Sequence, residues 1–134
     1  MDNREQSLKK LFDVTDKVAC VTGASSGLGR HAANVLAQSG ASVVGIARRQ
    51  DALQDWQREN IGKVAFEAHD LGDETQLDEL VNKVSEHYGP PDILVHAAGL
   101  NNRVHADNIN QSDWQQTLWL NLSVPFFLSQ HFVP

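Results

Sequence analysis

The sequence has few of the features that mark secreted or membrane proteins. Its 134 residues contain one cysteine, Cys20, which excludes an internal disulfide. Cys20 lies in the apolar run 18–21, a context typical of a small buried side chain in a reducing compartment. The first ten residues lack the apolar segment of a signal peptide, and no apolar stretch is long enough to span a bilayer. We therefore expect a cytoplasmic protein with no membrane partner.

An excess of positive charge is also lacking. The chain has 17 acidic and 11 basic residues, which gives a formal net charge of −6. This acidic balance disfavours a nucleic-acid partner. The six histidines are scattered without ligand spacing, so no metal site is expected. An anionic ligand would have to be bound by a local arrangement of groups, because the overall field repels it.

Apolar segments of two kinds alternate along the chain. We expect strands over residues 17–22, 41–47, 63–69 and 92–97, with a helix after each of them. Regular alternation of strand and helix predicts right-handed βαβ units around a parallel sheet. The expected fold class is α/β, a doubly wound parallel sheet of the Rossmann type with about four strands.

Local signals suggest how the helices begin and which faces they bury. In the first helix after residue 22, the apolar positions expected to face the core are Leu28, Ala32, Val35 and Leu36. In the third helix they are Leu77, Leu80, Val81 and Val84. Asp73 with Gln76 has the spacing of a capping box, which predicts a helix start there. Ser112 with Gln115 has the same spacing and predicts the start of a helix toward residue 130.

A glycine-rich turn, residues 22–29, joins the first strand to the first helix. A pyrophosphate needs backbone N–H groups directed at it, a positive helix N-terminus and no obstructing Cβ atoms. We expect Gly23 to permit the tight turn, Gly27 to admit phosphate, and Gly29 to let helix and strand pack closely. A purely structural turn is the alternative, and the strand-to-helix context favours the nucleotide site.

The end of the second strand suggests which dinucleotide binds. NAD-binding sites carry an acid there for the ribose 2′-hydroxyl, whereas an arginine accommodates the 2′-phosphate of NADP. This strand runs into Arg48 and Arg49 without an acid, and Ser25 of the glycine turn offers a hydroxyl. We therefore expect NADP(H), with NAD(H) as the less favoured cofactor. The alternative is a solvated pair of charges at the start of a helix, where arginine opposes the helix dipole.

The segment from Thr22 to Gly29 resembles the fingerprint of the classical short-chain dehydrogenase/reductase family, and the resemblance extends from about Phe12 to the end. It implies an NADP(H)-dependent oxidoreductase that transfers a hydride between nicotinamide and a small carbonyl or alcohol substrate. It also implies a homodimer or homotetramer at full length. The cofactor-binding residues expected from the pattern and the resemblance together are Thr22, Gly23, Ser25, Ser26, Gly27, Leu28, Gly29, Arg48, Arg49, Asp70, Leu71, Ala98 and Gly99.

Four of these residues take their role from the resemblance alone, namely Asp70, Leu71, Ala98 and Gly99. Asp70 matches the family's adenine-binding aspartate, although a turn-forming role is the alternative. Ala98 and Gly99 match the end of the family's Asn-Asn-Ala-Gly motif, whereas His96 and Ala97 depart from it. We interpret His96 as a hydrogen-bonded structural residue in preference to a catalytic one.

The resemblance assigns one catalytic residue to this chain, Asn121. Pro125 follows four residues later and has no N–H to donate to the Asn121 carbonyl, so a bend is expected there. A buried asparagine beside a tolerated proline kink is the alternative. The family's Tyr-x-x-x-Lys segment is absent, because the one tyrosine, Tyr88, is followed by Asp92 at the lysine position.

The expected organisation is an N-terminal extension, residues 1–16, followed by an NADP-binding Rossmann domain, residues 17–134, that is incomplete at its C-terminal end. A catalytically inactive nucleotide-binding protein or a truncated relic is the alternative to an enzyme.

Overall fold

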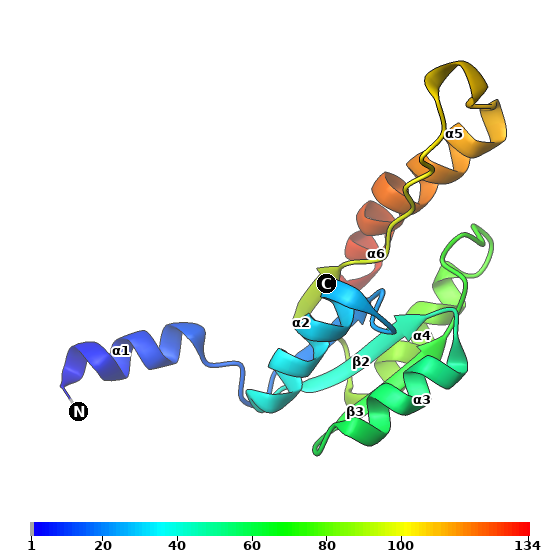
Figure 1. Ribbon diagram of the computed structural model, residues 1–134. Helices are drawn as coiled ribbons and strands as arrows, with labels where there is room; N and C mark the ends of the chain where they lie inside the picture. Colours follow the sequence, from blue (N-terminus) through cyan, green and yellow to red (C-terminus); the bar gives the residue numbers. More distant parts are fainter. Residues whose placement is uncertain (1) are drawn as a thin grey trace.

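A four-stranded parallel sheet forms the centre of the protein (Figure 1). The computed structural model describes residues 2–134. The strands are β1 (Val18–Thr22), β2 (Ser42–Ala47), β3 (Val64–Ala68) and β4 (Ile93–His96), and they lie in the order β3-β2-β1-β4. The expectation of an α/β, doubly wound fold is confirmed.

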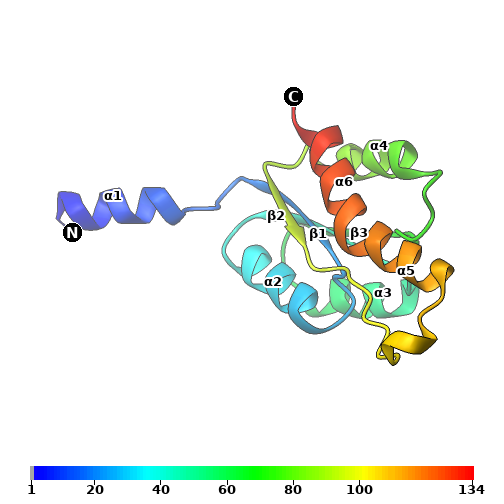
Figure 2. The ribbon, with the colours of Figure 1, turned by 90° about the horizontal axis from the view of Figure 1, so that it is seen from above.

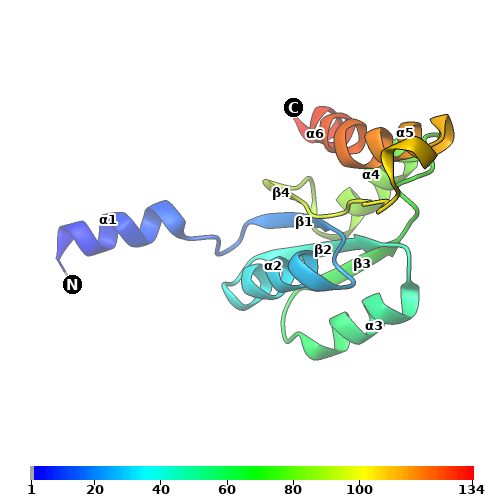
Figure 3. The same cartoon turned by 45° about the horizontal axis from the view of Figure 1, so that its top comes forward.

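Helices cover both faces of this sheet (Figures 2 and 3). Helices α2 (Gly27–Gln38) and α3 (Gln50–Glu59) lie on one face, and α4 (Leu77–Tyr88) lies on the other. Residues 111–132 form a nearly continuous helical rod, which packs beside α4. Within residues 2–134, no helix is both long and apolar enough to cross a membrane.

The rod contains a change of helical type. It begins as α5 (Gln111–Leu118), widens into the π-helix η2 (Trp119–Ser123) and continues as α6 (Val124–Phe132). The N–H of Val124 donates to the carbonyl of Trp119, a bond five residues long. Sequence analysis predicted one helix with a bend caused by Pro125; the π-turn is the form that this irregularity takes.

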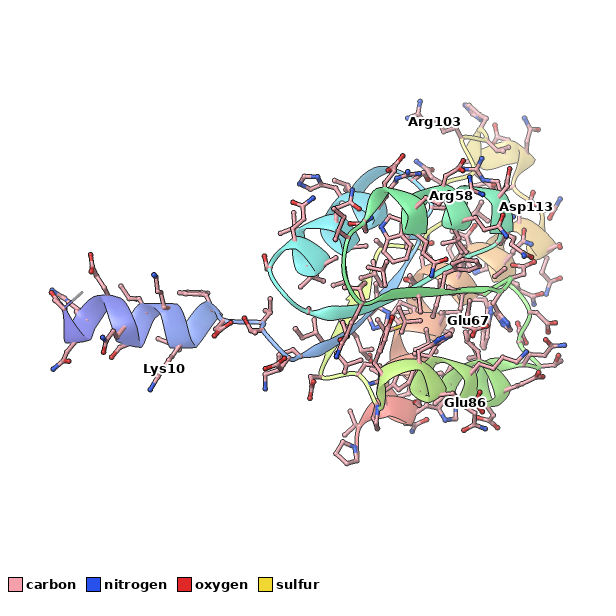
Figure 4. All side chains as sticks on the ribbon, turned by 90° about the horizontal axis from the view of Figure 1, so that it is seen from below. Lys10, Arg58, Glu67, Glu86, Arg103 and Asp113 are labelled. Atoms are coloured by element: carbon pink, nitrogen blue, oxygen red, sulfur yellow. The ribbon has the colours of Figure 1, made fainter. Side chains whose placement is uncertain are left out.

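The N-terminal helix α1 (Asn3–Phe12) extends away from the domain and buries no residue (Figure 1). Figure 4 shows Lys10 on this arm, well separated from the body of the protein. In the same view Arg58 of α3 and Glu86 of α4 lie on opposite sides of the sheet, with Glu67 of β3 between them.

The core layer beneath α2 and α3 is organised around Trp56. Its side chain is fully buried, and its indole N–H donates to Asn34 Oδ1 of α2 over 2.9 Å. A Cβ at Gly45 of β2 would lie 2.9 Å from both Ala24 and a Trp56 ring carbon. The indole therefore needs a glycine opposite it, and it supports the sheet beside the glycine-rich turn.

The opposite core layer lies between the sheet, α4 and α6. The predicted apolar stripe of α4 is confirmed, with Leu80 and Val84 buried against α6 and the sheet. Cys20 of β1 is buried in the same layer, as expected. Burial raises the pKa of its thiol to about 12, so the thiol stays protonated and inert at neutral pH.

The predicted core face of α2 is wrong in part, although Leu36 is partly buried against the core as expected. Leu28 and Val35 are 86% and 47% exposed, whereas Gly29, Ala33 and Ala37 face the sheet. Small residues let α2 approach the sheet more closely than leucine and valine would, so packing distance outweighs side-chain hydrophobicity here.

Both predicted capping boxes are also wrong. Helix α4 begins at Leu77, and Asp73 Oδ1 instead accepts hydrogen bonds from the N–H and hydroxyl of Thr75, 2.9 and 2.7 Å away. Helix α5 begins at Gln111, and its N-cap is Asn110, whose Oδ1 accepts from the Asp113 N–H. Thr75 provides the donors that Asp73 accepts, and Asn110 takes the N-cap position two residues before Ser112.

Strand β4 is only partly buried. Among the described residues it pairs with β1 alone and forms one edge of the sheet.

We expect Trp56→Phe to lower the free energy of unfolding by about 2 kcal/mol, because it opens a cavity and removes the bond to Asn34. Trp114→Phe is the matched control, since Trp114 is exposed on α5, and it should change stability by less than about 0.5 kcal/mol. Urea titration followed by circular dichroism measures both. Equal losses in the two variants would contradict the central role of Trp56.

Candidate functional site

The loops that follow the four strands meet at the carboxyl ends of the strands and enclose an open cleft of about 530 Å³. The connections leaving β1 and β4 run to opposite faces of the sheet, and such a switch point leaves a crevice for ligands. The cleft is lined by Gly23, Ser25, Ser26, Gly27, Leu28, Gly29, Ile46, Ala47, Arg48, His69, Asp70, Leu71, Gly72, Ala97, Ala98, Gly99, Leu100, Gln116 and Leu120.

The glycines of the turn have different physical roles. Gly23 has φ +70°, and a Cβ there would lie 2.8 Å from the backbone of Ala97 and of Ala98. A Cβ at Gly29 would lie 2.7 Å from the carbonyl carbon of Gly23. Gly27 has φ +57° and no atom within 4 Å of its absent Cβ. Gly23 and Gly29 therefore permit close packing, whereas Gly27 leaves open space at the start of α2.

The N-terminus of α2 opens into this space. The helix begins at Gly27, and the N-cap residue Ser26 makes no side-chain capping bond. The first N–H groups of a helix have no partner within it and carry partial positive charge. Together with the open Gly27, they form a place where an anionic group can approach the backbone.

Thr22 lies behind the cleft wall and does not line it. Its side chain is 3% exposed, and Oγ1 accepts hydrogen bonds from the N–H groups of Ala97 and Ala98, each 3.2 Å away. Thr22 therefore joins the end of β1 to the loop after β4. The sequence placed Thr22 near the cofactor, but this bond depends on the pairing of β1 with β4.

The two arginines after β2 are placed differently. Arg48 lines the cleft, whereas Arg49 occupies the N-cap position of α3 and does not. Across residues 2–134, neither of them forms an ion pair within 4 Å. Arg30 of α2 is already engaged, with Glu59 2.6 Å away and the Ser25 carbonyl 3.4 Å away. Arg48 is therefore the cationic side chain that the cleft offers to an anion.

The loop after β3 contributes Asp70 and Leu71, as expected. Asp70 Oδ1 accepts from the Gly72 N–H over 2.9 Å, so the turn-forming role considered for Asp70 is present. Leu71 is buried, and its carbonyl accepts a bond of 2.9 Å from the indole N–H of Trp119. His69 also lines the cleft, and its Nε2 is buried without a hydrogen-bond partner among the described residues. An unpaired buried nitrogen costs free energy that a polar ligand atom would recover.

The loop after β4 is held by Asn121 of η2. Asn121 Oδ1 accepts from the Leu100 N–H over 2.7 Å, and Nδ2 donates to the Leu100 carbonyl over 2.8 Å. Ala98, Gly99 and Leu100 line the cleft, whereas Asn121 lies behind them. The side chain of Asn121 therefore fixes the position of this wall.

Two titratable groups near the sheet lie outside the cleft. His96 Nε2 is 3.0 Å from Ser129 Oγ of α6, in agreement with a hydrogen-bonded structural role. Partial burial lowers the pKa of His96, because it disfavours the imidazolium. Its contribution to stability is therefore present above the unfolded pKa and declines as the pH falls below it. Tyr88 ends α4 against the second core layer, and burial raises the pKa of its phenol.

Sequence reasoning missed several residues of the cleft. Ile46, Ala47, His69, Gly72, Ala97 and Leu100 are chain neighbours of expected residues, so the strand ends could have indicated them. Gln116 and Leu120 come from α5 and η2, far away in sequence. No local signal marks these two, because only the packing of the rod brings them to the cleft.

Comparisons with known proteins agree with this geometry. The family model described as short chain dehydrogenase matches residues 17–134. An NAD-dependent glycerol dehydrogenase of Listeria innocua is 31% identical over 121 residues, which are 90% of this chain and 48% of that protein. A 2-dehydro-3-deoxy-D-gluconate 5-dehydrogenase of Formosa agariphila is 30% identical over 128 residues, with 92% and 48% covered.

A solved structure gives the same result. L-sorbose reductase of Gluconobacter frateurii, in complex with NADPH and L-sorbose, superposes with a TM-score of 0.82 at 29% identity, covering 92% of this chain and 49% of that one. The chain thus spans about half the length of these three proteins.

We expect Thr22→Val to lower the free energy of unfolding by about 1 kcal/mol, because the partly buried N–H groups of Ala97 and Ala98 lose their acceptor. Amide hydrogen exchange at these two residues should accelerate. Thr22→Ser keeps the hydroxyl and should retain slow exchange. Fast exchange in both variants, or in neither, would contradict the role assigned to Oγ1.

Proposed function

Since this chain belongs to the short-chain dehydrogenase family, we propose that its residues 17–134 form the NADP(H)-binding region of an oxidoreductase. The proposed reaction transfers a hydride between the nicotinamide and a small carbonyl or alcohol substrate. The bound dinucleotide supplies the hydride chemistry, and the protein binds and orients the reactants.

The observation that carries this proposal is the open cradle at the start of α2. Gly27 has no atom within 4 Å of its absent Cβ, and the first turn of α2 directs N–H groups into the cleft. A pyrophosphate fits such a cradle, because backbone donors and the helix dipole compensate its charge. The chain carries a net charge of −6, which repels anions. The backbone donors at the start of α2 therefore have to attract the pyrophosphate against this overall field.

Arg48 supports the choice of NADP(H) over NAD(H). It lies at the end of β2 with no ion-pair partner among residues 2–134, and Ser25 lines the same cleft. The last residue of β2 is Ala47, so the strand ends without the carboxylate that would bind a ribose 2′-hydroxyl and repel a 2′-phosphate. Relatives of both kinds exist, since the Listeria protein is NAD-dependent and the sorbose reductase holds NADPH.

The remaining expected residues receive proposed roles along the cleft. Asp70 and Leu71 form the wall proposed for the adenine, and Ala98 and Gly99 the wall toward the nicotinamide. Asn121 holds the latter wall through Leu100 and is the member of the family's catalytic set that residues 1–134 contain. The tyrosine and lysine that protonate or deprotonate the substrate are proposed to lie outside these residues. Assembly as a homodimer or homotetramer is proposed on the resemblance alone.

The activity is tested with the protein purified from its natural source, with any residues outside 1–134, together with NADPH and a panel of small ketones and sugar-derived carbonyls. Absorbance is followed at the reduced nicotinamide band. Turnover of NADPH supports the oxidoreductase. Tight NADPH binding without turnover of any carbonyl would favour the nucleotide-binding protein that lacks catalysis.

We expect Arg48→Ala to raise the Kd for NADPH about ten-fold or more, because a charge-assisted bond to the 2′-phosphate is lost. The Kd for NADH should change little. Arg58→Ala is the matched control, since Arg58 lies near the end of α3 and does not line the cleft. Isothermal calorimetry with both nucleotides measures these values, and an equal loss for NADPH and NADH would argue against a 2′-phosphate site at Arg48.

We expect Gly27→Ala to weaken binding of both NADPH and NADH about ten-fold or more, because its Cβ would enter the space proposed for the pyrophosphate. Gly62→Ala controls for backbone strain. Gly62 also has a positive φ and open surroundings, and it does not line the cleft. Both variants should lose stability, by about 1 kcal/mol, in thermal unfolding. Nucleotide affinity unchanged by Gly27→Ala would place the pyrophosphate elsewhere.

A further inference from the structure

The wall formed by Asp70 and Leu71 is anchored by the buried Leu71 side chain and by one hydrogen bond to its backbone from outside the loop. Within the loop of residues 70–76, Asp70 Oδ1 accepts from the Gly72 N–H, and the Asp70 carbonyl accepts from the Asp73 N–H over 3.0 Å. Asp73 and Thr75 bond to one another. These bonds shape the loop, but they do not fix its position relative to the rest of the cleft.

Trp119 supplies that external bond. Its indole N–H donates to the Leu71 carbonyl over 2.9 Å, across 48 positions of sequence. Among the described residues, this is the one hydrogen bond that joins residues 70–75 to another part of the chain, whereas Gln76, the N-cap of α4, accepts from the Leu80 N–H. The Trp119 ring also stacks on Phe127 of α6, with centroids 6.0 Å apart and planes 29° apart. The donor is therefore fixed in orientation by packing.

The π-helix that carries Trp119 also carries Asn121, which holds the opposite wall through Leu100. Side chains two positions apart on a helix point about 200° apart, so the two residues reach different loops. One five-residue segment thus anchors the loop after β3 and the loop after β4. The width of the cleft between them depends on that segment.

We propose that Trp119 is a positioning residue for nucleotide binding, which fixes the Asp70–Leu71 wall in register with the wall held by Asn121. The inference rests on the proposed function, because it assigns the adenine half of the nucleotide to this wall. Without the indole N–H, the loop after β3 loses its hydrogen bond to η2. In a fraction of the unliganded molecules, Asp70 and Leu71 then lie away from the position that contacts the nucleotide.

The test compares Trp119→Phe with two controls. Trp119→Phe keeps an aromatic ring but removes the donor. Phe127→Leu loosens the packing of the indole and keeps the donor, and Trp114→Phe removes an exposed indole from the same rod. Calorimetry measures the Kd for adenosine 2′,5′-bisphosphate, which carries the adenine half alone, and the Kd for NADPH. Amide hydrogen exchange is measured in each unliganded variant.

We expect Trp119→Phe to raise both Kd values about five-fold, the equivalent of one neutral hydrogen bond. Phe127→Leu keeps the donor but loosens its orientation and should raise them less, and Trp114→Phe should change them little. Exchange should accelerate in residues 70–76 and stay unchanged in residues 23–29. A merely structural role would accelerate exchange in both segments, because it would destabilise the whole domain. Either that uniform acceleration or unchanged affinity with unchanged exchange overturns the proposal.

Failure of the proposed function would look different. If the unaltered protein bound neither nucleotide, while exchange in residues 70–76 still accelerated in Trp119→Phe, the dinucleotide site would be wrong. The proposal that Trp119 positions a nucleotide-binding wall would then be overturned with it, and only the local bond to Leu71 would stand.

Discussion

Gly23 lies where the backbones of β1, α2 and the loop after β4 approach one another within contact distance. A Cβ at Gly23 or at Gly29 would overlap backbone atoms, which cannot move aside as a flexible side chain can. This close approach sets the position of the helix N-terminus over the end of the sheet. The cleft, its donors and the distance between its walls all depend on that contact.

Side chains behind the cleft maintain the arrangement that the glycines permit. The hydroxyl of Thr22 joins β1 to the loop after β4, and Asn121 holds the next part of that loop. Trp56 supports the sheet beside the glycine-rich turn and links α3 to α2 through Asn34. Most of these groups do not face the ligand space. They restrict the conformations of the loops that line the cleft. This reduces the conformational entropy that those loops would lose when a ligand binds.

The electrostatics of the site are local. The protein is acidic as a whole, and the cleft offers a helix N-terminus and Arg48 as its positive groups. Such a site binds anions through directed N–H groups at short range, where screening by salt is weakest. In the proposed NADP(H) site, selectivity between related dinucleotides is assigned to Arg48 after β2.

The sequence by itself determined that the strands form a parallel sheet. It also determined the chemistry of the loops at the carboxyl ends of these strands. Short apolar runs and glycine spacing are local patterns, so β1 to β4 and the turn at Gly23 could be predicted from neighbouring residues alone. The exact face of α2 and the starts of α4 and α5 could not, because Asp73 and Asn110 found local donors and small residues faced the sheet. Only the tertiary structure brought Gln116 and Leu120 to the cleft and Trp119 to the Leu71 carbonyl. Their contacts join segments tens of residues apart, and such pairs exist only when the rod has packed across the sheet and the π-turn has set its rotation.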